Sequence, residues 1–135
     1  METARNLCLV LEKKADLGRE IRLAYSQEDK ETLQEIANIK IPVLLQRLQD
    51  FYQSFRTQWN LENKSFGFEV QTVRIGGLLQ RLKDVQEILN AYLREEISGI
   101  AELNEPQKAF HYFEQNEIRS LNYNLWTDIV SPSKI

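Results

Sequence analysis

The sequence predicts an all-α fold, a helical bundle of about four helices that ends in an irregular, partly extended C-terminal tail. The strongest observation lies between Ser65 and Glu96, where apolar residues recur at intervals of 3, 4, 3, 4 and 3. This spacing is typical of a long helix that packs against other helices. Its members are Ile75, Leu78, Leu82, Val85, Leu89 and Tyr92. A second apolar stripe, rich in aromatic residues, runs from Ile41 to Trp59 and predicts another long helix.

Length and composition predict one soluble domain over residues 1–135, because the chain is 42% apolar and 27% charged. The net charge of -3 gives no electrostatic reason to expect a nucleic-acid partner. No apolar run approaches the roughly 20 residues that span a bilayer, so no membrane contact is expected. The single cysteine, Cys8, excludes an internal disulfide and favours a reducing compartment. A cytoplasmic location is therefore expected.

The first helix is predicted over about Thr3–Tyr25. Beside its main apolar face runs a stripe of mostly small residues, namely Ala4, Cys8, Leu11, Ala15 and Gly18. Small side chains let a neighbouring helix approach closely, so this helix is expected to pack on two sides. A break follows over Ser26–Asp29, and Asp29 is predicted to cap a short helix that continues through Ala37.

The third helix is predicted to begin near Ile41, because Pro42 is tolerated in the first turn of a helix. The polar connector Asn60–Lys64 is short enough to make the third and fourth helices antiparallel neighbours. The fourth helix is about 30 residues, or close to 45 Å, long. Gly76 and Gly77 lie in its interior, where each costs about 1 kcal/mol relative to alanine, and their expected role is close packing.

The pattern becomes irregular after Gly99, and the tail over residues 122–133 reads as a strand or an extended segment. A lone strand cannot satisfy its own backbone hydrogen-bonding groups. The tail is therefore expected to pair with, or to lie upon, another element.

No catalytic residue, metal ligand set or cofactor site is predicted. One histidine and one cysteine are too few for a zinc or iron–sulfur site. His111 could serve a phosphorelay or act as a general base, but it lacks a regular helical face and also fits a half-buried histidine beside aromatic residues. Cys8 lies on the small-residue stripe and is interpreted as part of the core.

A polar group interrupts the apolar pattern in the first turns of the long helix. It comprises Glu69, Gln71 and Arg74, and Gln71 stands where the spacing calls for an apolar residue. Two interpretations stay open: a structural hydrogen-bond network, or a contact with a ligand or another domain. Trp126, in the tail, is typical of core or interface positions.

One segment resembles a family. It reads Phe66-Gly67-Phe68-Glu69-Val70-Gln71-Thr72-Val73-Arg74-Ile75-Gly76-Gly77-Leu78. This segment resembles one in the bacterial β-N-acetylhexosaminidases of glycoside hydrolase family 20. More narrowly, it resembles the helical C-terminal domain that follows the catalytic barrel in one branch of that family. The resemblance extends to residues 11–18, 51–59 and 123–131, and so covers nearly the whole chain. The tail differs from the family pattern at Leu125, where a basic residue is usual.

The resemblance implies a parent enzyme that removes terminal β-linked N-acetylglucosamine or N-acetylgalactosamine by substrate-assisted catalysis. In that family a glutamate is the general acid/base and the adjacent aspartate orients the acetamide, an exception to the scheme with two catalytic carboxylates. No Asp-Glu dipeptide occurs in this chain. No catalytic residue is therefore transferred, and the chain is not expected to be an enzyme on its own.

The implied role is to brace the catalytic barrel of the parent chain and to contribute to a subunit interface, for example in a homodimer. The residues expected to make these contacts are Glu69, Gln71, Arg74 and Trp126. Two alternatives stay open: a free-standing helical interaction module, and a small enzyme or phosphorelay domain that uses His111.

Overall fold

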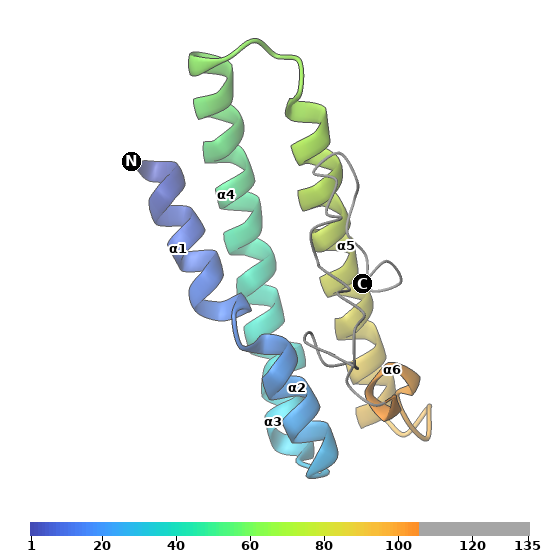
Figure 1. The fold of residues 1–135 in the computed structure, drawn as a ribbon. Helices are drawn as coiled ribbons and strands as arrows, with labels where there is room; N and C mark the ends of the chain where they lie inside the picture. Colours follow the sequence, from blue (N-terminus) through green and yellow to red (C-terminus); the bar gives the residue numbers. More distant parts are fainter. Residues whose placement is uncertain (106–135) are drawn as a thin grey trace, which may run out of the picture. The chain divides into compact units, whose positions relative to one another are not determined.

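The computed structural model describes residues 1–105, which form helices joined by short connections (Figure 1). The elements are α1 (Glu2–Lys14), α2 (Leu17–Ser26), α3 (Lys30–Glu35), the π-helical turn η1 (Ile36–Lys40), α4 (Ile41–Glu62), α5 (Phe68–Leu93) and α6 (Ala101–Asn104). This part of the chain contains no strand, and the predicted all-α class is confirmed. The predicted extended tail, with His111 and Trp126, lies outside the described residues.

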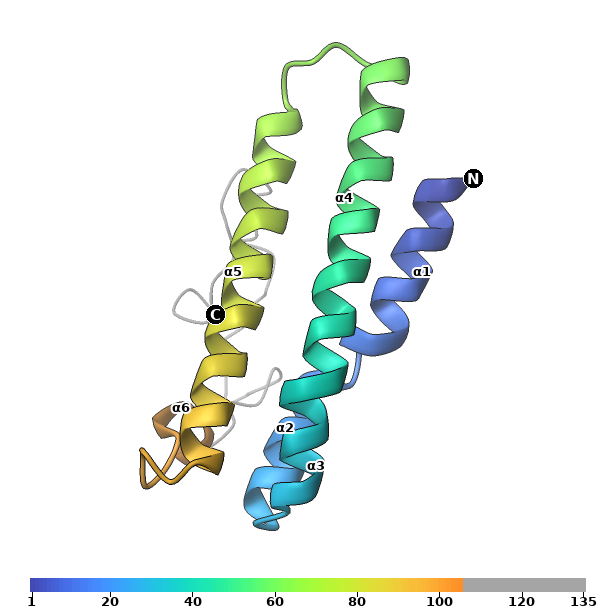
Figure 2. The same cartoon turned by 180° about the vertical axis from the view of Figure 1, so that it is seen from behind.

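The chain divides into two units, Met1–Asn104 and Glu105–Ile135. The single domain expected over residues 1–135 therefore stays a prediction. Within the first unit, α4 lies between α1 and α5, as the views from the front and from behind both show (Figures 1 and 2). The chain reverses between α4 and α5, which are antiparallel neighbours as predicted.

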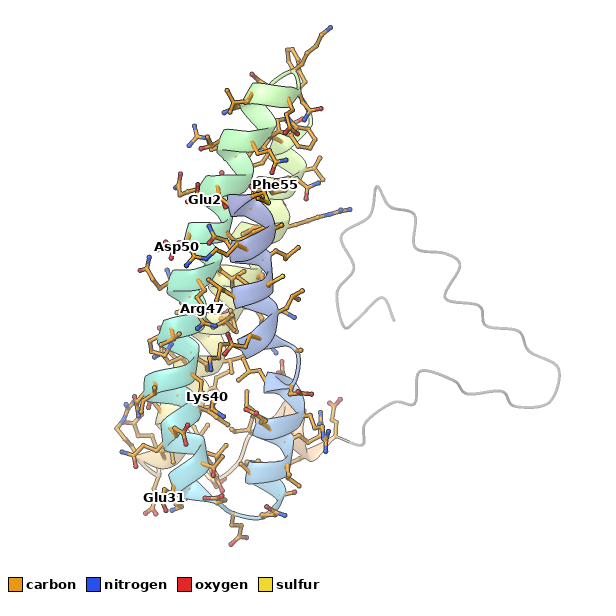
Figure 3. All side chains as sticks on the ribbon, turned by 90° about the vertical axis from the view of Figure 1, so that its left-hand side faces the viewer. Glu2, Glu31, Lys40, Arg47, Asp50 and Phe55 are labelled. Carbon is orange, nitrogen blue, oxygen red and sulfur yellow. The ribbon has the colours of Figure 1, made fainter. Side chains whose placement is uncertain are left out.

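Hydrogen bonds connect α1 to α4 where the two helices pack side by side (Figure 3). The Arg47 guanidinium donates to the Leu9 carbonyl at 2.7 Å and to the Glu12 carboxylate at 3.0 Å. Further along the same edge, the Asn6 amide donates to the Ser54 hydroxyl at 3.1 Å. These bonds tie α1 to α4 over several turns.

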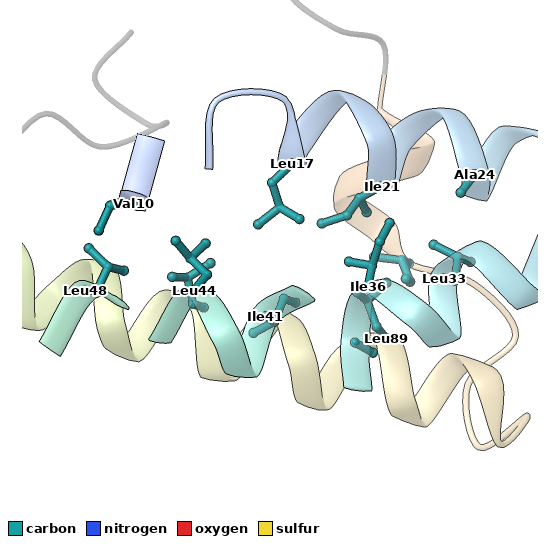
Figure 4. Close-up of a cluster of buried hydrophobic side chains, with 13 residues drawn as sticks. Val10, Leu17, Ile21, Ala24, Leu33, Ile36, Ile41, Leu44, Leu48 and Leu89 are labelled. Atoms are coloured by element: carbon teal, nitrogen blue, oxygen red, sulfur yellow. The ribbon is translucent and has the colours of Figure 1, made fainter. Parts of the chain in front are cut away.

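The core is most completely buried where α2, α3 and η1 meet α4 and α5 (Figure 4). The side chains that are 0% exposed are Leu33, Ile36, Ala37, Ile41 and Leu44. From α5, Leu82 and Leu89 of the predicted apolar spacing are also buried, at 6% and 1% exposure. The periodicity therefore identified the buried face of α5 correctly.

The single helix predicted over Thr3–Tyr25 is wrong, because the chain breaks at Ala15 and Asp16 between α1 and α2. The break lets α1 pack along α4 while α2 packs against α3. Periodicity does not reveal it, since Val10 and Leu17 are seven residues apart and both stay buried across the break.

The expectation that this first segment packs on two sides is also not met within the described residues. All five members of its small-residue stripe are exposed, so the interpretation of Cys8 as a core residue is wrong.

The helices predicted to end at Ala37 and to begin near Ile41 form one continuous run through η1. In η1 the Ile41 N–H donates to the Ile36 carbonyl, five residues back. The next donor in that register would be residue 42, a proline without an N–H. The Ala37 carbonyl accepts instead from the Gln86 side chain of α5, with Nε2 at 2.7 Å.

We expect Gln86→Leu to lower the free energy of unfolding by about 1–3 kcal/mol, because it leaves the Ala37 carbonyl without a partner. Gln80→Leu is the matched control, since Gln80 is exposed on the same helix and its amide donates to the side chain of Asp84, four residues on, rather than to a backbone carbonyl of another helix. We expect the control to change stability by less than about 0.5 kcal/mol. Urea unfolding of the 135-residue chain measures both, and equal losses would contradict the assigned bond.

Asp29 caps α3 as predicted. Its carboxylate accepts from the Thr32 N–H at 3.0 Å and from the Thr32 hydroxyl at 2.6 Å. These bonds, the hydroxyl bond foremost, hold the pKa of Asp29 below its ordinary value of 3.8.

Because the pKa of Asp29 is lower in the folded state, its cap is fully effective above about pH 3.8 and is lost as the pH falls through the folded-state pKa. Asp29→Asn keeps a capping oxygen but does not titrate. We expect its melting temperature to fall less than that of the unaltered chain between about pH 5 and pH 2. Glu12, Glu95 and Glu96, whose pKa values are also lowered, titrate in both proteins and cancel. If the melting temperatures of the variant and the unaltered chain fell equally between about pH 5 and pH 2, the cap would make no pH-dependent contribution to stability.

Candidate functional site

The first turns of α5 follow a sharp reversal of the chain at Gly67. Gly67 has φ +99°, a left-handed conformation that glycine adopts without strain. Its N–H donates to the Glu69 carboxylate at 2.7 Å. An acidic side chain in the first turn also interacts favourably with the helix dipole. Glu69 therefore has a local role in starting α5.

An aromatic cluster holds the start of α5 against the end of α4. The Phe68 ring lies 5.5 Å from Phe55, 5.6 Å from Tyr52 and 5.7 Å from Trp59, centroid to centroid. Ring pairs at these separations add stability beyond the area they bury. The Trp59 indole N–H donates to the Lys64 carbonyl at 2.9 Å and fixes the connection as well. The N-terminal half of α5 is thus firmly positioned.

The structure does not bring Glu69, Gln71 and Arg74 together as one group. Positions two apart point to different sides of a helix, so Glu69 and Gln71 are separated. Gln71 and Arg74 are three apart, share a side and are both half-buried. Their predicted role in contacts with another domain or subunit stays a prediction, as does that of Trp126, which lies outside the described residues.

A feature that sequence reasoning missed is an exposed apolar stripe on the first turns of α5, together with a phenylalanine two residues before the helix. It consists of Phe66, Val70, Val73 and Gly77, spaced by four, three and four residues, and is called the outer stripe below. Phe66 is 87%, Val70 43% and Val73 56% exposed. The sequence does contain a signal for this stripe: a second apolar spacing on the same helix, offset from the one that begins at Ile75.

The close packing expected of Gly76 and Gly77 is absent within the described residues. A Cβ built at either glycine meets no atom within 4 Å. Two such glycines cost about 2 kcal/mol of helix stability relative to alanine. No contact among the described residues compensates for this cost at those positions.

The described residues show no catalytic constellation. A hollow of about 460 Å³ beside α4 is lined by Gln46, Gln49, Asp50, Tyr52, Gln53 and Leu79. Among these lining residues the single carboxylate, on Asp50, accepts from the Gln46 amide at 3.0 Å, and none of the other five is a histidine, a lysine or an arginine. Among residues 1–105, no group of three histidine, cysteine, aspartate or glutamate side chains could hold a metal ion. No helix in this range is long and apolar enough to cross a membrane.

Comparison with known proteins gives one finding. A family model, the Glycoside Hydrolase 20C C-terminal domain, matches residues 1–122. No curated protein matches the chain. The matched range contains every helix described above, the aromatic cluster and the outer stripe. The chain therefore belongs to the Glycoside Hydrolase 20C C-terminal domain family.

Proposed function

We propose that this chain is the non-catalytic C-terminal domain of a β-N-acetylhexosaminidase, and that it braces the catalytic barrel and contributes to a subunit interface. The observation that carries the proposal is the family match over residues 1–122, because that family is defined as the C-terminal part of a glycoside hydrolase. The parent enzyme would release terminal β-linked N-acetylglucosamine or N-acetylgalactosamine in the cytoplasm.

The sequence supports a non-catalytic role. Substrate-assisted cleavage in the family that the chain resembles needs an adjacent aspartate and glutamate, and no Asp-Glu dipeptide occurs in the 135 residues. The proposed acid/base chemistry therefore belongs to the barrel. A domain of this kind would act through its surface.

Two exposed surfaces support a role in contacts. On α5, which the aromatic cluster holds in place, Arg74 borders the outer stripe, while Gln71 is in register with the apolar residues Ile75 and Leu78. We propose that Gln71 and Arg74 contact the barrel, together with Glu69 and Trp126. On α1, Leu7 is 39% and Leu11 49% exposed beside Cys8, and this face would supply the contact with a second subunit.

The test uses the full-length enzyme, the same enzyme without this segment, and the isolated 135-residue chain. The isolated chain should not release product from a chromogenic N-acetylhexosaminide, and the shortened enzyme should be less stable. A free-standing interaction module would instead leave the stability of the enzyme unchanged. Turnover by the isolated chain would contradict the non-catalytic role.

A further inference from the structure

We propose that the outer stripe of α5, formed by Phe66, Val70, Val73 and Gly77, is the surface on which the catalytic domain of the same polypeptide docks. This inference rests on the proposed function and specifies its contact surface. It differs from the polar contacts expected from the sequence, because it assigns the centre of the interface to apolar side chains and a bare stretch of helix backbone.

The stripe has the composition of an interface centre. None of its four members is charged, while Glu69 and Arg74 flank it, and the centres of interfaces are depleted in charge and bordered by polar residues. Phe66 is 87% exposed, although large aromatic side chains are usually buried. An exposed apolar patch bordered by polar residues marks a site of interaction.

Gly76 and Gly77 make the surface suitable for close approach. Among residues 1–105, no atom beyond the local helix backbone lies within 4 Å of a Cβ built at either glycine, so a neighbouring element could come within contact distance of the helix backbone. From Val70 to Gly77 the stripe extends over about 10 Å of helix, and Phe66 adds to it from the turn before α5. This length fits one side of a helix or the side chains of a barrel strand laid along α5.

Its size favours a tethered neighbour over a second copy of the chain. The stripe offers only three apolar side chains, Phe66, Val70 and Val73, whereas stable complexes between free proteins bury about 800 Å² on each partner, from about 20–30 residues. A domain joined by a peptide linker is held at an effective concentration in the millimolar range and needs less contact area. The family match provides such a neighbour, since the matched domain is the C-terminal part of a larger enzyme.

The stripe is also pre-positioned for docking. Phe68, which follows Phe66 by two residues, is buried and contacts three rings of α4. The Thr72 hydroxyl lies 3.0 Å from the Tyr52 hydroxyl and hydrogen-bonds with it. Because this side of α5 is fixed to α4, the opposite side can bind a partner without rearrangement of the bundle.

The first experiment measures maleimide labelling at Val73→Cys in a Cys8→Ser background, in the isolated chain and in the full-length enzyme. We expect labelling to be at least about tenfold slower in the full-length enzyme, because a docked surface reacts only when it opens. Gln49→Cys, on the exposed side of α4, is the control and should label at similar rates in both.

The second experiment adds Gly77→Leu to Val73→Cys. In the isolated chain the new side chain meets no atom of the described residues and replaces a helix glycine, so the melting temperature should rise by about 3–6 °C. In the full-length enzyme the same change should block close approach and speed the labelling of Val73→Cys. Gly18→Leu is the matched control, since Gly18 also lies in a helix with open space around it, and it should leave labelling unchanged.

Equal labelling of Val73→Cys in both proteins would overturn the inference. Slow maleimide labelling of Val73→Cys already in the isolated chain would also overturn it. If that slow labelling depended on concentration the occupant would be a second copy, and if it did not the occupant would be residues 106–135. None of these results would by itself refute a bracing role, which is tested separately by removing the segment and measuring the stability of the enzyme.

Discussion

Replacing Leu44 by alanine should lower the free energy of unfolding of the chain by about 2–5 kcal/mol. Leu44 is 0% exposed and belongs to the buried cluster that α4 shares with residues of α1, α2 and α5 (Figure 4). The substitution removes buried apolar volume, and the continuous helix run on both sides of Leu44 limits how far the cavity can collapse. A loss of this size is a large share of the stability of a small domain.

Val43→Ala is the matched control for this prediction. Val43 is the preceding residue on the same helix, and its side chain is 39% exposed. We expect the control to cost less than about 1 kcal/mol, because an exposed side chain loses little contact on truncation. Urea unfolding monitored by circular dichroism measures both variants, and comparable losses would mean that Leu44 does not lie at the centre of the core.

Much of the fold could be predicted from the sequence, because burial on a helix leaves a regular spacing. The intervals on α5 identified Leu82 and Leu89, which are buried. The apolar face predicted between Ile41 and Trp59 includes Leu44 and Leu48, which are buried as well. The cap at Asp29 was also predictable, since capping depends on local chemistry. Features set by neighbouring residues along the chain were therefore found.

Features that depend on tertiary contacts were missed. In the π-helical turn, Pro42 has no N–H to donate to the Ala37 carbonyl, and the side chain of Gln86, more than forty residues later, donates instead. The break at Asp16 keeps the apolar face in register, so no pattern marks it. The two glycines of α5 were predicted to be packed, and only the position of the surrounding helices shows that the space beside them is open.

The same limit applies to the candidate site. Sequence reasoning selected Glu69, Gln71 and Arg74 because they interrupt an apolar pattern. In the structure the Glu69 carboxylate accepts a local hydrogen bond from the Gly67 N–H. The outer stripe lies on a side of α5 that the predicted apolar spacing does not occupy. On α5 one set of regularly spaced apolar residues already packs inside the bundle. A second such set on the same helix indicates a second packing surface, and this second spacing is visible in the sequence.

The second large effect concerns the parent enzyme. Removing residues 1–135 should lower the melting temperature of the catalytic domain by roughly 5–10 °C, the shift expected when a large domain loses an interface worth a few kcal/mol. Turnover of a chromogenic N-acetylhexosaminide at low temperature should persist, because the proposed acid/base residues lie on the barrel.

A full-length enzyme that carries Leu44→Ala serves as an intermediate case. It retains the segment but weakens its core, so its barrel should melt between the intact and the shortened enzymes. This ordering separates loss of a folded brace from an effect of simply shortening the chain.

The most direct measurement is calorimetry of the full-length enzyme with and without this segment, paired with a hydrolysis assay of the isolated chain. A non-catalytic brace predicts a lower melting temperature for the shortened enzyme and no hydrolysis by the isolated chain. An unchanged melting temperature, or release of product by the 135 residues alone, would contradict it.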